Sequence, residues 1–155
     1  MTTQTNKYPR NNITPIASRQ DAFNRAWERL ITHFDWGQSV DDASVVISNC
    51  LYRTADGNSC VIGYMFPDEL YESCLENIPA CDIVMGNSTK VPLDKHNKIQ
   101  KFFCSFSEGP FYNDLGTFYS RLQLIHDKKT NWNCKEWMLI ALREFAKTWD
   151  LTCPE

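Results

Sequence analysis

Three segments of this chain repeat apolar residues at the spacing of an amphipathic helix, and this pattern constrains the fold most. They cover about residues 18–37, 115–127 and 133–149. Ser18 is suited to cap the first helix, because Asp21 follows three residues later. Each apolar stripe is wide enough to pack against a core. We therefore expect three long helices.

A β-hairpin is expected between the first and second of these helices. Residues 45–53 and 59–65 are rich in residue types that favour strands. Asp56 and Gly57 between them are typical of a hairpin turn. The sequence therefore predicts two short antiparallel strands.

The register of this hairpin depends on the length of its loop. A two-residue loop sets Arg53 opposite Cys60, whereas a longer loop shifts the register and can set Cys50 opposite Cys60. After the second strand, Pro67 is suited to the first position of a helix. A short helix is expected at about 67–76.

These elements together define the expected fold class. Residues 77–113 contain prolines and glycines and are expected to be rich in loops, with a strand or a helical turn at 98–106. About four helices packed on a small antiparallel β-hairpin or sheet give an α+β fold. We expect one compact domain over residues 18–152, preceded at residues 1–17 by a flexible arm or by a strap that lies over the domain.

Composition excludes several classes of partner. The net charge is −3 and the cations are scattered, which argues against nucleic-acid binding. The chain has no apolar run long enough to span a membrane and no secretion signal, so we expect a soluble, cytoplasmic protein. Its seven cysteines include no C-x-x-C pair, and its histidines lack the spacing of metal ligands. Free thiols, no metal site and no cofactor are expected.

One set of residues has the chemistry of a thiol enzyme. Cys60 is a candidate nucleophile, with His126 as the base and Asp127 as the group that orients it. No catalytic signature surrounds Cys60, and a cysteine between apolar residues is more typical of a core.

A second set has the chemistry of a ligand site. Arg53 is suited either to an internal ion pair or to a phosphate or carboxylate group. If the polar edge of the second long helix faces the hairpin, aromatic, charged and hydrogen-bonding groups line one cleft suited to a nucleotide-like ligand. The candidate ligand-binding residues are Tyr52, Arg53, Tyr119, Gln123, His126 and Asp127.

Two motifs in the chain carry a resemblance. The patterns CLYR..DG..C..G...PDELY and LQ..HD occur here, and SVDD precedes them. In these motifs the chain resembles an uncharacterised family of small bacteriophage and prophage proteins, over about residues 20–150. The resemblance implies a phage or bacterial setting, hence the cytoplasm of a host cell, and no particular reaction.

Three functional hypotheses follow. The first is a non-enzymatic phage accessory protein that binds a small nucleotide-like ligand and, most specifically, sequesters a host immune signal as an anti-defence protein. The second is a small thiol-dependent hydrolase that uses Cys60, His126 and Asp127. The third is a module that binds a host protein through the aromatic-rich segment at 102–112.

Overall fold

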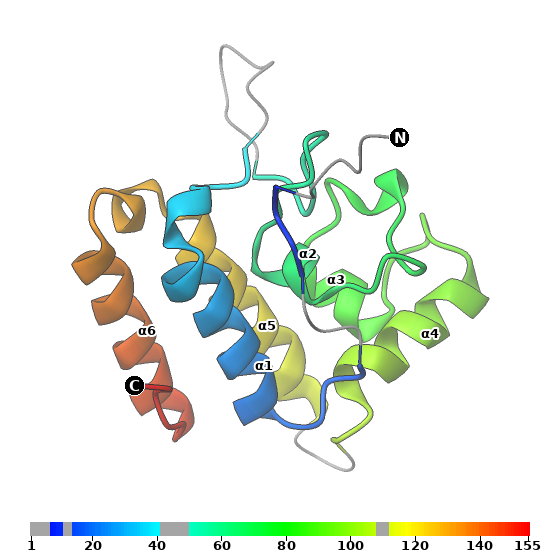
Figure 1. Cartoon of the computed structure of the whole chain (residues 1–155). Helices are drawn as coiled ribbons and strands as arrows, with labels where there is room; N and C mark the ends of the chain where they lie inside the picture. Colours follow the sequence, from blue (N-terminus) through cyan, green and yellow to red (C-terminus); the bar gives the residue numbers. More distant parts are fainter. Residues whose placement is uncertain (1–6, 11–13, 41–49, 108–111) are drawn as a thin grey trace.

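The chain folds into a set of helices (Figure 1). The computed structural model describes residues 7–10, 14–40, 50–107 and 112–155. The α-helices in these ranges are α1 (Arg19–Trp27), α2 (Val61–Met65), α3 (Ala80–Met85), α4 (Leu93–Cys104), α5 (Tyr112–Asp127) and α6 (Lys135–Trp149). Shorter turns are the π-helical η1 (Glu28–Thr32) and the 3-10 helical η2 (Phe34–Trp36), η3 (Ser73–Leu75) and η4 (Lys129–Trp132).

The expected α+β fold class is wrong, because the fold is all-α. In the described residues, β pairing is limited to two isolated antiparallel bridges, Val40 with Cys50 and Arg53 with Ser59. The part of the first expected strand at 45–49 lies outside the described residues.

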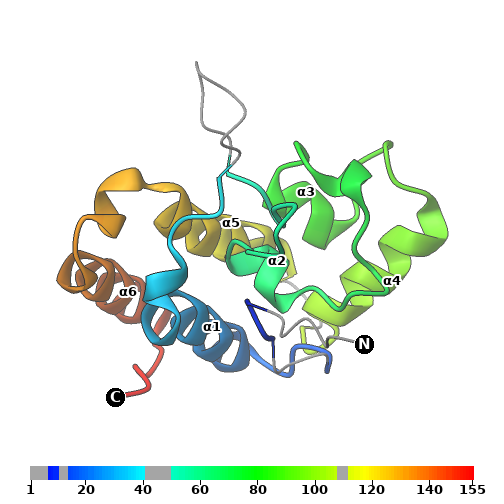
Figure 2. The same ribbon diagram turned by 45° about the horizontal axis from the view of Figure 1, so that its top comes forward.

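The three long helices predicted from periodicity are present as α1 with η1, α5 and α6. They share an aromatic core in which the ring of Phe145 stacks on Phe23 at 5.8 Å and packs against Phe118 at 5.3 Å. These three residues come from α6, α1 and α5, respectively. Figures 1 and 2 show α1 lying beside both α5 and α6.

Helix α2 replaces the predicted second strand at 59–65. Its five residues are all buried, and the helix packs against α1 and α5. Cys60 caps it, because the Cys60 sulfur accepts a hydrogen bond from the N–H of Gly63 at 3.3 Å. An apolar run buried on every side has no alternating pattern, so its composition alone does not separate a strand from a buried helix.

The hairpin before α2 is shorter than predicted and has a different register. The N–H of Cys60 donates to the Tyr52 carbonyl at 3.2 Å, and Arg53 pairs with Ser59 rather than with Cys60. The turn is therefore one residue longer than the two-residue loop. The helix expected at 67–76 is reduced to a turn after Pro67 and to η3.

Helices α3 and α4 lie in the segment expected to be rich in loops. Pro79 and Pro92 are their N-cap residues, and Gly86 ends α3 in the left-handed conformation at φ 71°. Proline fixes φ near its helical value, so here it starts helices rather than interrupting them. Helix α3 packs against both α4 and α5.

A buried arginine fastens the hairpin to the first helix. Arg29 lies in η1 with no exposed surface, and it donates to the carbonyls of Ser59 at 2.6 Å and Gly37 at 2.7 Å and to Asn58 Oδ1 at 3.0 Å. Burial lowers its pKa to about 10, so the guanidinium stays charged near neutrality. This one side chain therefore fixes the position of the hairpin relative to η1.

Candidate functional site

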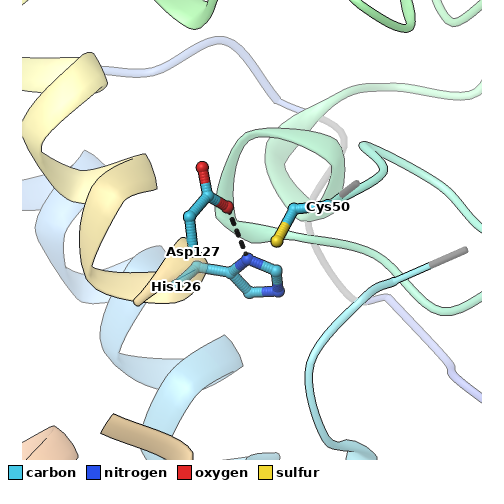
Figure 3. A group of neighbouring side chains, drawn as sticks. All are labelled: Cys50, His126 and Asp127. Carbon is cyan, nitrogen blue, oxygen red and sulfur yellow. Dashed lines mark hydrogen bonds and ion pairs between the residues drawn. The ribbon is translucent and has the colours of Figure 1, made fainter. Parts of the chain in front are cut away.

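Three chemically reactive side chains meet where the hairpin approaches the C-terminal end of α5 (Figure 3). They are Cys50, His126 and Asp127, and their sulfur, nitrogen and oxygen atoms lie within 4.8 Å of one another. Figure 3 shows the Cys50 side chain pointing toward the imidazole and the carboxylate. Cys60, the cysteine proposed from the sequence, is not part of this group.

The hydrogen bonds of His126 define its tautomer. The backbone N–H of Ser39 donates to Nε2 at 3.1 Å, so Nε2 is the acceptor and carries no proton. The proton therefore sits on Nδ1, which donates to Asp127 Oδ1 at 3.0 Å. Burial also lowers the pKa of His126, which is completely buried. The imidazole is neutral at neutral pH and is held in one orientation.

This hydrogen bonding argues against a catalytic thiol at Cys50. Burial raises the pKa of Cys50 to about 12, and the nearby carboxylate of Asp127 adds to the shift. The thiol thus stays protonated near neutrality. His126 has no unshared ring nitrogen to take that proton, because Ser39 occupies Nε2 and Nδ1 already carries its hydrogen.

The same donor set does not fit a metal ion. A neutral imidazole that binds a metal through Nδ1 must carry its proton on Nε2. In this structure the N–H of Ser39 points at Nε2, so a proton there would face another donor. Cys50, His126 and Asp127 are therefore a cluster in which His126 donates to Asp127 and the Cys50 thiol lies beside them.

Cys60 is also unsuited to catalysis. The residue has no exposed surface, and burial raises the pKa of its thiol. Its sulfur is engaged as the N-cap acceptor of α2. Its role in this structure is to begin a buried helix.

A cavity of about 450 Å³ opens beside the Cys50 cluster. Its walls come from the hairpin, from the segment that leads into α3 and from the end of α5. The lining residues are Cys50, Tyr52, Asn77, Ile78, Pro79, Ala80, Gln123 and Asp127. Asp127 is the charged residue in this lining, and its side chain is 33% exposed.

Three of the predicted ligand-binding residues line this cavity. The hydroxyl of Tyr52 donates to the carbonyl of Ile78 and so joins two walls. Gln123 accepts from the N–H of Ile62 at 3.2 Å and donates to Asp127 Oδ1 at 2.8 Å. Asp127 is thus oriented by Gln123 on one side and by His126 on the other.

Tyr119 lies away from this cavity, in contrast to the expectation of one shared cleft. It is fully buried, and its hydroxyl donates to the Phe103 carbonyl at 2.6 Å. Its spacing from Gln123 places both on α5, but the Tyr119 ring packs edge-on against Phe103 of α4, with the ring centres 5.3 Å apart.

Arg53 also lies outside the cavity and is paired internally. Its guanidinium donates to Asp68 Oδ1 at 2.8 Å and to the Phe66 carbonyl, and it lies 4.6 Å from the centre of the Tyr71 ring. Arg10, from the described part of the N-terminal arm, binds the same Asp68 oxygen and the same carbonyl. Of the two roles open to Arg53, the structure shows the ion pair.

Glu76 is a supporting residue that the sequence did not single out. It accepts the backbone N–H of Tyr52 at 2.9 Å and of Arg53 at 3.0 Å, and the hydroxyl of Tyr71 at 2.7 Å. Burial raises the pKa of Glu76, while these donors favour its charged form. Glu76 therefore holds the hairpin segment that forms one wall of the cavity.

Cys50 and Ser39 were missed as site residues, although both belong to the motifs that carry the phage-protein resemblance. Their contacts with α5 join positions far apart in the sequence, 87 residues in the case of Ser39 and His126. The motifs could therefore have indicated these two residues, whereas the spacing of residues within one helix or strand could not.

Comparison of the chain with protein-family models, with curated proteins and with solved structures finds no match. Among the described residues, no helix is both long enough and apolar enough to cross a membrane.

Proposed function

We propose that this protein is a non-enzymatic binding protein that holds one small ligand in the cavity beside Asp127. The observation that carries this proposal is the combination of a cavity of about 450 Å³ with a partly exposed carboxylate in its wall. Small-molecule sites in proteins are typically of this size and have a few oriented polar groups among apolar ones.

The orientation of Asp127 supports a binding role. Gln123 and His126 both donate to Oδ1 and so fix the plane of the carboxylate. Ser39 and Ile62 in turn fix these two side chains through their backbone N–H groups. A polar group held in advance by such partners loses little conformational entropy when a ligand binds.

The charge of the lining favours a particular class of ligand. A carboxylate attracts N–H donors and cationic groups, and no cation lines the described part of this cavity. The proposed ligand therefore presents an amine or the N–H edge of a nucleobase to Asp127. This changes the nucleotide hypothesis in one respect, since the base rather than the phosphate enters the cavity.

The bacteriophage setting implied by the motif resemblance suggests a purpose for such binding. A protein that retains the base of a nucleotide-derived signal removes that signal from its host receptor. We therefore keep the sequestration of a host immune signal as the specific form of this proposal. The thiol hydrolase is not kept, because burial keeps the thiols of Cys50 and Cys60 protonated near neutrality. The sulfur of Cys50 also accepts a hydrogen bond from Gln38 at 3.4 Å, and that of Cys60 caps α2.

The proposal is tested by thermal denaturation with a panel of nucleosides, cyclic nucleotides and ADP-ribose derivatives. A ligand at about 100 times its Kd raises the free energy of unfolding by about 2.7 kcal/mol, or about 5–11 °C in Tm for a chain of this size. A panel in which no compound shifts Tm contradicts the proposal.

Two matched variants locate the site. Asp127→Asn removes the charge but keeps an acceptor oxygen for His126, so the variant should fold and lose the ligand-induced shift. Asp68→Asn removes a carboxylate from the Arg10–Arg53 cluster and should respond to ligand as the wild type does. The opposite pattern, with binding lost in Asp68→Asn and kept in Asp127→Asn, assigns the ligand to the arginine cluster and refutes this site.

A further inference from the structure

Among the described residues, three of the four large exposed hydrophobic side chains lie on the neighbouring helices α5 and α6, whose shared outer surface we call the α5–α6 face. Leu124 on α5 is 54% exposed, and Trp137 and Ile140 on α6 are 49% and 57% exposed. Among the described residues, the remaining large exposed hydrophobic side chain is Leu93 on α4. Exposed apolar groups gathered in this way are typical of an interaction surface.

A shallow groove of about 310 Å³ runs between α5 and α6 on this face. Its apolar lining is made of Leu124, Ile125, Ala141 and Phe145, of which Leu124 is exposed and Phe145 is buried. Ile140 lies next to Ala141 on α6, and Trp137 lies one turn before it. The groove therefore offers apolar surface for an inserted side chain, beside apolar residues that project outward.

The two walls of this groove differ in charge. Arg121 from α5 and Lys128, the residue directly after α5, line one wall, whereas Glu144 from α6 lines the other. Within the described structure, none of these three side chains forms an ion pair with another residue. A wholly acidic partner would be repelled by Glu144, and a wholly basic one would be repelled by Arg121 and Lys128. A partner with the same two walls in opposite order is complementary to both.

We propose that the α5–α6 face binds a second copy of this chain and forms a two-fold symmetric dimer. Such an interface brings the same surface of both copies together, so each α5 wall faces the α6 wall of the other copy. Leu124 of each copy then enters the groove of the other, and Glu144 of each faces Arg121 and Lys128. Because α5 and α6 are joined by a short connection, two copies form a four-helix arrangement.

The mass of the protein over a concentration series tests this proposal directly, by sedimentation equilibrium. We expect a reversible transition from the 18.0 kDa chain to twice that mass. Leu124→Lys should move this transition to higher concentration by about tenfold or more, because a charge is buried in the apolar centre. Leu93→Lys is the matched control, since it makes the same change on α4 and should leave the transition in place.

Charge reversal gives a second test that does not depend on apolar packing. Glu144→Arg alone and Arg121→Glu with Lys128→Glu should each weaken self-association, because like charges then face each other twice. Mixed together, the two variants should form a heterodimer, since every facing pair is again of opposite sign. Both sets of substitutions are at exposed positions, and circular dichroism verifies that the variants fold.

Three results would overturn the proposal. These are a monomer at every concentration, a dimer that Leu124→Lys does not weaken, and a mixture of the charge variants that stays monomeric. Capture of a different protein by this face in a monomeric chain counts against self-association as well, because it assigns the groove to another partner.

Discussion

Replacing Gly63 by alanine should destabilise the protein strongly, because the hairpin backbone occupies the space that a Cβ atom needs. A Cβ built on Gly63 lies 1.7 Å from the carbonyl oxygen of Tyr52 and 2.5 Å from its carbonyl carbon. Ordinary van der Waals contact begins at 3.4 Å, so the two backbones must separate by about half that distance. Both neighbours are backbone, which cannot move aside as the end of a flexible side chain can.

The magnitude follows from three contributions. Overpacking a core costs about 1–3 kcal/mol, and its upper end applies where the neighbour is backbone. Separation also weakens the 3.2 Å hydrogen bond from Cys60 N–H to the Tyr52 carbonyl, worth about 1 kcal/mol. Alanine returns up to about 1 kcal/mol through its helix propensity. We expect a net loss of about 3 kcal/mol in the free energy of unfolding, or about 6–12 °C in Tm.

Urea denaturation followed by tryptophan fluorescence measures this loss. Gly116→Ala in α5 is the control, because its Cβ meets the flexible side chain of Met85 at 3.2 Å. That variant should stay within about 1 kcal/mol of the wild type. If Gly63→Ala were no less stable than Gly116→Ala, the close approach of the hairpin to α2, and with it the wall formed by Tyr52, would be refuted.

Three further predictions concern the buried polar groups. Burial lowers the pKa of His126 below its ordinary 6.5, so the unfolded chain binds the proton more readily than the folded one. Below pH 6.5 the free energy of unfolding of the wild type should therefore fall by up to about 1.4 kcal/mol per pH unit relative to that of His126→Gln. Equal pH profiles of the two proteins in urea denaturation would contradict this. Arg29→Met should lower the free energy of unfolding by about 3–5 kcal/mol in the same assay, because buried carbonyl acceptors lose their donor. A loss under about 1 kcal/mol would contradict this and show that these carbonyls find other partners. Because the pKa of Cys50 is raised to about 12, this thiol should resist alkylation in the native protein near neutral pH, while the exposed Cys74 and Cys134 react. Peptide mapping that finds Cys50 among the fastest-reacting thiols would contradict this and show that the site contains a reactive thiol.

The parts of the fold that the sequence predicted are those with a solvent-exposed face. α1, α5 and α6 each bury one side, so their apolar residues recur at helical spacing. α2 is buried on all sides, and Val61-Ile62 suggested a strand by propensity alone. Tertiary packing against α1 and α5 decided its conformation.

The prolines before α3 and α4 show that proline can begin a helix as well as interrupt one. Pro79 and Pro92 favour loops by residue type, yet each is the N-cap residue of a helix. His96, Ile99 and Phe103 are buried along α4 at helical spacing, a signal present in the sequence. The same start signal at Pro67 is followed by a turn, so proline alone does not decide where a helix begins, and at α4 the helical spacing of these buried residues is the second signal.

The candidate site was predictable in part. Gln123 and Asp127 share one edge of α5 because they are four residues apart, and both line the cavity. Cys50 rather than Cys60 lies beside His126, and this difference from the prediction follows from the hairpin register and from the formation of α2. Neighbouring residues of an extended segment point to opposite sides. Tyr52 therefore lines the cavity while Arg53 pairs with Asp68, and the two do not share one cleft.

The cavity beside Asp127 is tested most directly by a crystal structure of the wild type after incubation with cell extract or with a compound that raises its Tm. We predict a ligand in the cavity of about 450 Å³, with an N–H group donating to the carboxylate of Asp127. A ligand bound instead at Arg10 and Arg53, or a phosphate group placed against Asp127, would contradict the account.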